Sequence, residues 1–223
     1  MSRSESPVDT DSAADAVAAF ARGDPVLVHD AADREGETDV IYPAGAVDSA
    51  AVAHMRNDAG GLVCVALSDA VADALDLPFM REVVDHPTAA DHELGYDERS
   101  SFSLTVNHRD TFTGITDEDR ALTIRELAAT AADPDAAAFA EAFRSPGHVH
   151  LLRAAPNLLD DREGHTELGI ALAAAADQPP AAVVCEMLDD ETGEALPPAA
   201  ARAYAEREGL VYVEGAALLA ALD

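Results

Sequence analysis

The chain has 223 residues, with 43 Asp and Glu, 14 Arg and no Lys, which gives a formal net charge of −29. Without lysine it cannot be a Schiff-base aldolase, a pyridoxal-phosphate enzyme or a P-loop protein, and its negative field disfavours nucleic acid and anionic membranes as partners. Because 48% of the residues are hydrophobic, it is not a disordered acidic tail. A folded, lysine-free, acidic surface is typical of proteins in very high salt. We therefore interpret the chain as a halophile's cytoplasmic protein, the alternative being an acidic protein of a mesophile.

The predicted elements alternate along the chain. We expect helices at residues 11–22, 49–58, 68–75, 116–131, 133–143, 164–176 and 199–208, and after residue 213. We expect strands at residues 25–28, 40–42, 62–67, 101–106, 149–152, 182–186 and 210–213. Residues 78–98 have no clear period and are predicted to form a long functional or mobile loop.

This alternation, without a linker or repeat, predicts one α+β domain over residues 11–223. The expected architecture is a layered α/β sandwich, with a mixed twisted sheet flanked by helices. No G-x-G-x-x-G motif follows a strand, so a dinucleotide fold has no support. Residues 1–10 are predicted to be disordered and lack the apolar core of a signal peptide. Cys64 and Cys185 lie in apolar runs without a C-x-x-C spacing, so we expect reduced core thiols.

The acidic segment from Asp33 to Asp39 lies between two predicted strands and holds four carboxylates and one arginine. Alternate residues of an extended chain point to the same side, so Glu35, Glu37 and Asp39 converge. Three such carboxylates repel one another unless a cation lies among them, and hard oxygen ligands suit Mg²⁺ or Mn²⁺. A solvated acidic loop is the alternative.

Two residues are candidates for proton transfer. Pro146-Gly147 predicts a turn that presents His148 just before a strand. Glu186 ends a strongly apolar strand, where partial burial would raise its pKa into a useful range. The alternatives are a surface histidine and a glutamate in solvent beyond the strand end.

The segment Arg162–Glu167 is predicted to open an amphipathic helix. Free N–H groups and the positive end of the helix dipole lie there. Together with the Arg162 guanidinium, the Thr166 hydroxyl and the close approach that Gly164 permits, they suit a phosphate. His165 would then remain as a metal ligand. Plain N-capping by Thr166 is the alternative.

In order and spacing these motifs resemble the 3,4-dihydroxy-2-butanone 4-phosphate synthase family. The resemblance covers nearly the whole chain and rests on six segments: Asp33 to Asp39, Gly61 to Cys64, Thr113 to Arg120, Pro146 to His148, Arg162 to Glu167 and Cys185-Glu186. It implies a lyase of riboflavin biosynthesis that converts ribulose 5-phosphate into 3,4-dihydroxy-2-butanone 4-phosphate and formate. The alternatives are another Mg²⁺-dependent lyase or isomerase of a different phosphosugar, and a non-enzymatic interaction or storage domain.

The resemblance also implies residue roles. Glu35 and His165 would bind Mg²⁺ or Mn²⁺, with Glu37 beside a second ion, and His148 and Glu186 would be the catalytic pair. The implied substrate contacts are Arg34, Glu35, Asp39, Thr113, Arg162, Glu163, Gly164, His165, Thr166 and Glu186. Members of the family form homodimers with active sites near the subunit interface, so we expect a homodimer.

Two positions depart from the family pattern. Glu163 replaces a glycine and adds a negative charge beside the phosphate loop, which is tolerable where its side chain points away. His150 stands where the family commonly has phenylalanine and can change the packing beside His148. Some relatives continue into a GTP cyclohydrolase II domain. This chain stops at Asp223 without a cysteine cluster for that domain's zinc, so we expect a monofunctional enzyme.

Overall fold

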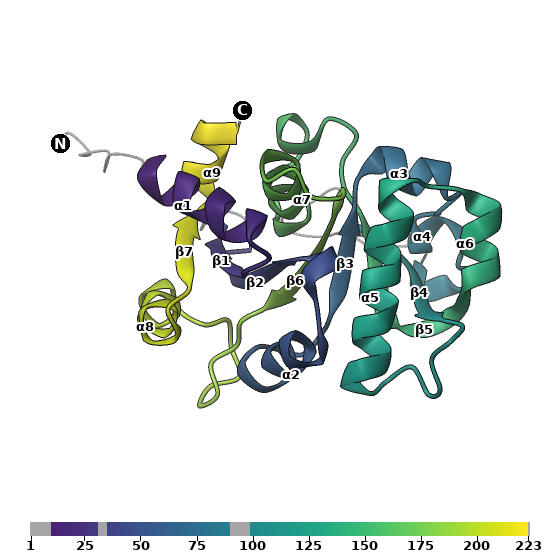
Figure 1. Ribbon diagram of the computed structural model, residues 1–223, viewed down its shortest axis with the longest axis horizontal. Coiled ribbons are helices and arrows are strands. Elements are labelled where there is room, and N and C mark those ends of the chain that lie inside the picture. Colours follow the sequence, from purple (N-terminus) through teal and green to yellow (C-terminus); the bar gives the residue numbers. More distant parts are fainter. Residues whose placement is uncertain (1–9, 31–34, 90–98, 223) are drawn as a thin grey trace.

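The computed structural model describes residues 10–30, 35–89 and 99–222, and the side chains of this part from residue 13 onward. Helices cover both faces of a central sheet (Figure 1), which confirms the predicted layered α+β architecture. The strands described are β1 (Val26–His29), β2 (Thr38–Pro43), β3 (Cys64–Leu67), β4 (Phe102–His108), β5 (Phe143–Arg153), β6 (Ala181–Glu186) and β7 (Val211–Glu214). The α-helices described are α1 (Thr10–Ala21), α2 (Ser49–Asp58), α3 (Asp69–Ala74), α4 (Met80–Val83), α5 (Asp117–Ala132), α6 (Ala136–Ala142), α7 (His165–Ala175), α8 (Pro198–Glu208) and α9 (Gly215–Leu222).

The sheet is mixed, with the strand order β4-β5-β3-β6-β2-β1-β7. The pairs β1–β7 and β3–β5 are parallel, whereas β2 and β6 pair antiparallel with each other and with their other neighbours. The register places Asp39 at the start of β2 opposite Glu186 at the end of β6. It also places Cys64 of β3 beside His150 of β5. Residues far apart in the sequence therefore meet at one end of the sheet.

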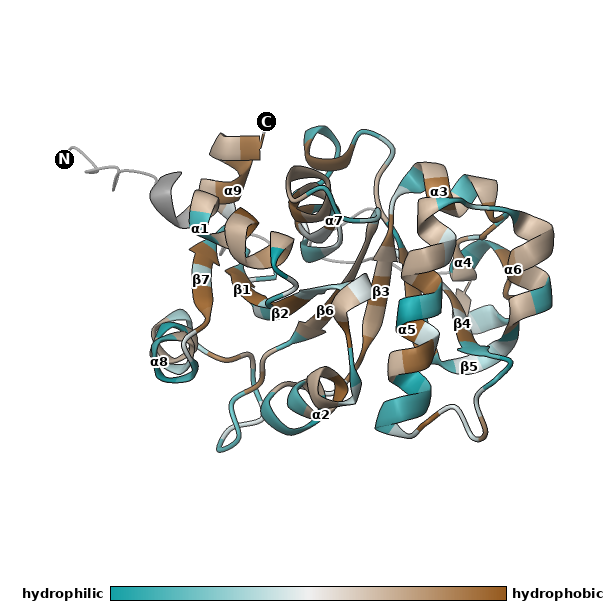
Figure 2. Ribbon diagram, viewed as in Figure 1, coloured by the Kyte–Doolittle hydropathy of each residue, from teal (hydrophilic) through white to brown (hydrophobic). Residues whose placement is uncertain are grey.

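Alternation along the strands divides the core between the two faces of the sheet. Within β1, Val26 and Val28 pack with residues of α1, α7 and α9, whereas Leu27 packs with residues of α2 and α5 on the other face. All three of these side chains are fully buried. This is the period of two expected for a strand with apolar layers on both sides. The central strands are accordingly mostly hydrophobic (Figure 2).

Local capping sets several helix starts. The Asp48 carboxylate accepts from the Ala51 N–H at the start of α2, and the Thr116 hydroxyl accepts from the Asp119 N–H at the start of α5. The capping of α5 confirms the prediction made from the Thr116–Asp119 spacing. No helix among the described residues combines the length and apolarity needed to cross a bilayer.

Four predictions need correction or fall outside the described residues. Residues 78–98 are not a loop throughout, because Met80–Val83 form α4 and Pro87–Ala89 form a 3-10 turn, while 90–98 lie outside the described residues. The first helix begins at Thr10, so the segment predicted to be disordered, residues 1–10, is helical at its last residue, and residues 1–9 lie outside the described residues.

The other two corrections concern β5 and α7. His148 does not follow a turn, since β5 runs as one strand through Pro146-Gly147, with a register shift in its pairing with β4. The residues predicted to form a turn instead form a bulge within the strand. Helix α7 is not amphipathic, because every residue from His165 to Ala173 is buried between the sheet, α1 and α9. A helix covered on several sides has no polar stripe.

Candidate active site

A cavity of about 530 Å³ opens where β2, β6 and the N-terminus of α7 meet. It is lined by seven residues that the sequence singled out: Glu35, Glu37, Asp39, Arg162, His165, Thr166 and Glu186. Glu35 and Glu37 lie in the segment before β2, and Arg162 lies in the segment before α7. The fold therefore joins the acidic segment, the phosphate-type loop and the strand-end glutamate in one place.

His165 is held in one orientation by the backbone. Its Nε2 lies 3.1 Å from the Val28 carbonyl oxygen, which can only accept, so Nε2 carries a proton and donates it. Its Nδ1 lies 3.4 Å from Asp39 Oδ1 and 3.8 Å from Glu35 Oε2. A backbone carbonyl that fixes one ring nitrogen and directs the other into a carboxylate cluster is the usual support of a metal-binding histidine.

Asp30 belongs to the same cluster. Ligand atoms of Asp30, Glu35 and His165 lie within 4.8 Å of one another. The carboxylate of Asp30 also accepts from the backbone N–H groups of Glu35, at 3.3 Å, and Glu37, at 3.0 Å. Asp30 therefore shapes the turn that directs the two glutamates. Two carboxylates and one imidazole at this spacing form a donor set that fits Mg²⁺ or Mn²⁺.

Burial makes these carboxylates hard to ionise. It raises the pKa of Asp39, of Glu186 and of Glu37, and the neighbouring carboxylates raise these pKa values further. Burial alone would lower the pKa of His165, but Asp39 and Glu35 outweigh it and raise that pKa. Asp39 Oδ1 is buried without a hydrogen bond. A buried cluster of like charges with such an oxygen is electrostatically suited to a cation.

The start of α7 offers donors to an anion. Its N-cap is Gly164, and no side chain caps the helix, so the alternative of N-capping by Thr166 is wrong. Thr166 lines the cavity with Arg162, whose Nη1 donates to Ser101 Oγ. Free helix N–H groups beside a guanidinium and a hydroxyl can bind a phosphate.

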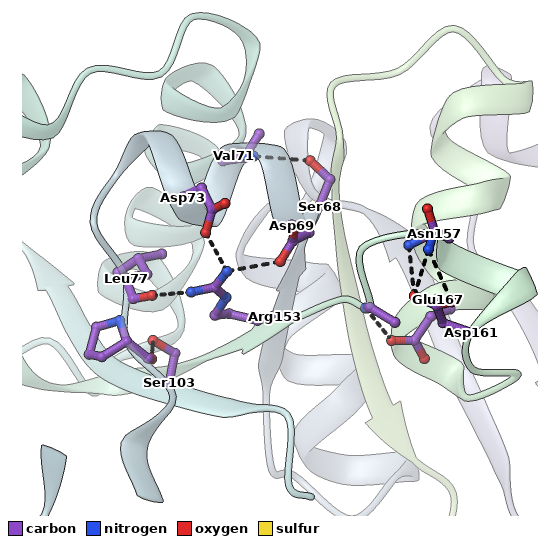
Figure 3. Close-up of polar contacts among 12 residues, drawn as sticks. Ser68, Asp69, Val71, Asp73, Leu77, Ser103, Arg153, Asn157, Asp161 and Glu167 are labelled. Carbon is purple, nitrogen blue, oxygen red and sulfur yellow. Dashed lines mark hydrogen bonds and ion pairs between the residues drawn. The ribbon is translucent and has the colours of Figure 1, made fainter. Parts of the chain in front are cut away.

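Glu167, in the first turn of α7, contacts the segment between β5 and α7. Its side chain is fully buried, and its Oε1 accepts from the Ala155 N–H at 2.9 Å (Figure 3). Its Oε2 lies 3.8 Å from Nε of Arg162. This ion pair helps to hold the Arg162 guanidinium, which lines the cavity, beside the start of α7.

Other predicted site residues lie elsewhere. His148 and Thr113 are exposed and are not among the described residues that line the cavity. They are nevertheless close to each other, because Asn107 contacts both His148 and Gly114. Glu163 is exposed, as its charge requires, and Gly164 is buried at the helix start. Arg34 lies outside the described residues.

Three residues in or beside the cavity, namely Asp30, Ser101 and Cys64, were not predicted to be functional. Asp30 directly follows β1, so an acid at a strand end was a usable signal. Ser101 had no sequence signal, since its role depends on Arg162. Cys64 is free and buried, as expected for a core thiol, but it also lines the cavity. Burial, and then Glu186, raise the pKa of the Cys64 thiol, so it is protonated and unsuited to act as a thiolate nucleophile.

A carboxylate and imidazole cluster beside a free helix N-terminus suits the class of enzymes that use a divalent cation and a phosphorylated substrate. The sequence profile of the 3,4-dihydroxy-2-butanone 4-phosphate synthase family matches residues 14–221. The chain therefore belongs to the 3,4-dihydroxy-2-butanone 4-phosphate synthase family.

Individual relatives agree with this assignment. The chain is 50% identical over 209 residues to the 3,4-dihydroxy-2-butanone 4-phosphate synthase of Archaeoglobus fulgidus, covering 88% of each chain. It is 46% identical over 213 residues to that of Methanothermobacter thermautotrophicus, covering 92% of this chain and 93% of the relative. A crystal structure of a 3,4-dihydroxy-2-butanone 4-phosphate synthase in complex with two magnesium ions superimposes with a TM-score of 0.80 at 33% identity, covering 93% of this chain and 94% of the other.

Proposed function

We propose that the protein converts D-ribulose 5-phosphate into 3,4-dihydroxy-2-butanone 4-phosphate and formate, a lyase reaction of riboflavin biosynthesis. The observation that carries this proposal is the cavity in which a carboxylate and imidazole cluster lies beside Arg162 and the start of α7, in a chain that belongs to this family. That arrangement suits a small sugar phosphate, with one end for its phosphate and the other for its reacting hydroxyl and carbonyl oxygens.

Mg²⁺ is the cofactor we assign, with Mn²⁺ as a substitute and one or two ions per site. Glu35 and His165, together with Asp30, would hold one ion, and Glu37 lies next to them for a second. When bound, the metal polarises the sugar's carbonyl and stabilises the negative charge that develops on the substrate oxygens, without a lysine imine.

Asp39 and Glu186 are the groups we assign to proton transfer within the cavity. Loss of one carbon from a ketose phosphate needs enolisation, loss of the C1 hydroxyl as water, a skeletal shift and hydrolytic release of formate. Each of these steps moves a proton, so more than one acid or base is required. Asp39 and Glu186 lie opposite each other in the β2–β6 ladder, and burial raises the pKa of both, so each can hold a proton nearer to neutrality than an exposed carboxyl.

Arg162, Thr166 and the first N–H groups of α7 are the groups we assign to the substrate's phosphate. Arg162 and Thr166 both line the cavity, and Thr166 lies in the first turn of α7. Glu163 is exposed next to this end, so its charge can stay in solvent. Binding energy from the phosphate would hold the reacting carbons against Asp39 and Glu186.

We further infer a homodimer whose interface covers His148 and Thr113 and brings them to the substrate. Both are exposed, and Thr113 lies between Phe112, which is 92% exposed, and Ile115, which is 51% exposed. Large apolar side chains this exposed, within four residues of one another, are typical of an interaction surface.

The two free, buried cysteines suit a reducing compartment, which supports a cytoplasmic location.

Formate release from ribulose 5-phosphate tests the proposed function. In molar KCl with Mg²⁺ we expect formate, and we expect EDTA to abolish it. The variants E35Q and H148A should lose activity, whereas E206Q, which removes an equal charge from an exposed position on α8, should keep it. A folded, Mg²⁺-supplemented protein that makes no formate would refute the proposal. Turnover of xylulose or ribose 5-phosphate in its place would indicate a different phosphosugar enzyme.

A further inference from the structure

Asn107 of β4 is a buried amide at the point where two glycine-containing segments cross the strand. It is 3% exposed. A Cβ on Gly147 would lie 1.9 Å from the Val106 carbonyl carbon, and a Cβ on Gly114 would lie 2.0 Å from Asn107 Nδ2. No side chain fits at either glycine, because backbone or amide already fills the space. The Pro-Gly-His segment and the Thr-Gly-Ile segment therefore both pack directly on Asn107.

The amide of Asn107 also makes three close contacts with two atoms of His148, the backbone nitrogen and Nδ1. The backbone N–H of His148 donates to Asn107 Oδ1 at 2.8 Å, which identifies the oxygen end of the amide. The imidazole Nδ1 of His148 lies 3.1 Å from Asn107 Nδ2 and 3.3 Å from Oδ1. The amide therefore presents both a donor and an acceptor to the same ring nitrogen.

We propose that Asn107 is a positioning residue that holds the His148 imidazole by Nδ1 and supports it in either protonation state, which leaves Nε2 to exchange protons with the substrate. When Nδ1 is bare, it accepts from the Nδ2–H of Asn107. When Nδ1 carries a proton, it donates to Oδ1. Neither change requires Asn107 to rotate, because both amide atoms already lie within 3.3 Å of Nδ1.

This arrangement matches the catalytic role that the family resemblance implies for His148, and in this respect the inference rests on the proposed function. A carboxylate at position 107 could only accept, so it would favour the form with a proton on Nδ1. An amide has no such bias. A reaction with several proton transfers needs a histidine that both takes and gives a proton, and an amide partner permits both.

The test compares N107D and N107L with T105V as the matched control. Thr105 Oγ1 accepts from the Gly147 N–H at 3.1 Å, so T105V removes a hydrogen bond from the same bulge without touching the imidazole. The ¹⁵N NMR signals of the His148 ring, assigned by their loss in H148A, report which nitrogen carries the proton. We expect N107D to shift the Nδ1 signal toward the protonated form, and T105V to leave it unchanged.

Kinetics supply the second readout. We expect N107L to lower kcat by about tenfold or more, since it forfeits part of the gain from a positioned acid or base. The KM for ribulose 5-phosphate should stay within about twofold, because Asn107 does not line the substrate cavity. Should N107L fail to fold, N107D carries the NMR test alone.

Two outcomes would overturn the positioning role. One is a His148 Nδ1 signal that is the same in N107D and in the unaltered protein. The other is an N107L variant that keeps full kcat although H148A is inactive. Failure of the proposed function has a different signature, namely an unaltered protein that releases no formate while the Nδ1 signal still shifts in N107D.

Discussion

Arg153, at the end of β5, ties three segments together, and its removal should destabilise the fold measurably. Its Nη1 donates to the Leu77 carbonyl at 2.6 Å, and its Nη2 donates to Asp69 at 2.8 Å and to Asp73 (Figure 3). Its guanidinium also lies over the Phe79 ring, 4.7 Å from the centroid. Phe79 and Arg153 line a second cavity, of about 500 Å³, that shares Ser101 and Arg162 with the active-site cavity.

The burial of each partner sets the expected cost of R153A. The side chains of Arg153 and Asp69 are 12% and 22% exposed, whereas that of Asp73 is 68% exposed. Charge-assisted hydrogen bonds in protected positions contribute about 1.5 kcal/mol or more each, which applies to Asp69 and Leu77. The exposed pair with Asp73 contributes about 0.5 kcal/mol, and molar salt screens it further. We expect R153A to lower the free energy of unfolding by about 3–4 kcal/mol. For a chain of this size, that corresponds to a Tm lower by about 10 °C.

The assay is denaturant and thermal unfolding of R153A, D69N and D73N in the same molar KCl. Because burial sets the strength of each contact, we expect R153A to lose the most unfolding free energy, D69N less, and D73N almost none. R153K should recover only part of the loss, because an ammonium cannot reproduce the guanidinium fork. An equal loss of unfolding free energy in D69N and D73N would refute this reasoning, because solvent exposure would then not determine how much each ion pair contributes to stability.

Three further outcomes are expected. Mg²⁺ at a hundred times its Kd should stabilise the unaltered protein and E206Q by about 2.7 kcal/mol but E35Q by much less, as unfolding with and without EDTA will show. The N–H groups of Gly114, Phe112 and Thr113 lower the pKa of Asp119. Its contribution to stability is therefore present above the unfolded-state pKa of about 4 and lost as the pH falls through the lower folded-state pKa. Urea unfolding should thus separate D119N from the unaltered protein at pH 7 and less so at pH 2, and a constant gap would contradict this. Lowering KCl from about 1 M to 0.1 M lengthens the Debye length from about 3 to 10 Å, so a chain with 43 acids should melt at lower temperature, and a melt indifferent to KCl would contradict it.

Elements that depend on local signals could be predicted, and those that depend on distant contacts could not. The predicted helix 49–58 has the observed bounds, because Asp48 caps its start locally. Helix α4 lies in a segment that is anchored from outside, by Arg153 through Leu77 and by the Ser103 hydroxyl through the Pro78 carbonyl. No period within residues 78–98 could show this. Likewise, β5 continues through Pro146-Gly147 only because Gly147 packs on the Val106–Asn107 peptide of β4.

The same distinction applies to the site. The convergence of Glu35, Glu37 and Asp39 on one cavity was predicted, but strand alternation is not its cause, because β2 begins at Thr38 and both glutamates lie in the turn before it. That Asp30 accepts from the N–H groups of Glu35 and Glu37 could not be predicted, because the turn between β1 and β2 has no repeating pattern. The pairing of Asp39 with Glu186 is a matter of sheet order, which places β6 beside β2 although 137 residues lie between the two strands.

The site residues fall into two groups with opposite solvent exposure, and this difference bears on how the site works. Asp30 and His165 are buried, so water would screen their interaction with a bound cation only weakly. His148 is exposed, although its Asn107 support is buried, so its ring is oriented in advance while its free nitrogen faces solvent. Exclusion of water strengthens the interactions between a catalytic group and its substrate. An imidazole that is held in one orientation but remains in water therefore interacts only weakly with the substrate. The proposed homodimer, in which a second copy of the chain covers His148, would exclude that water, and it predicts that a monomeric variant is inactive.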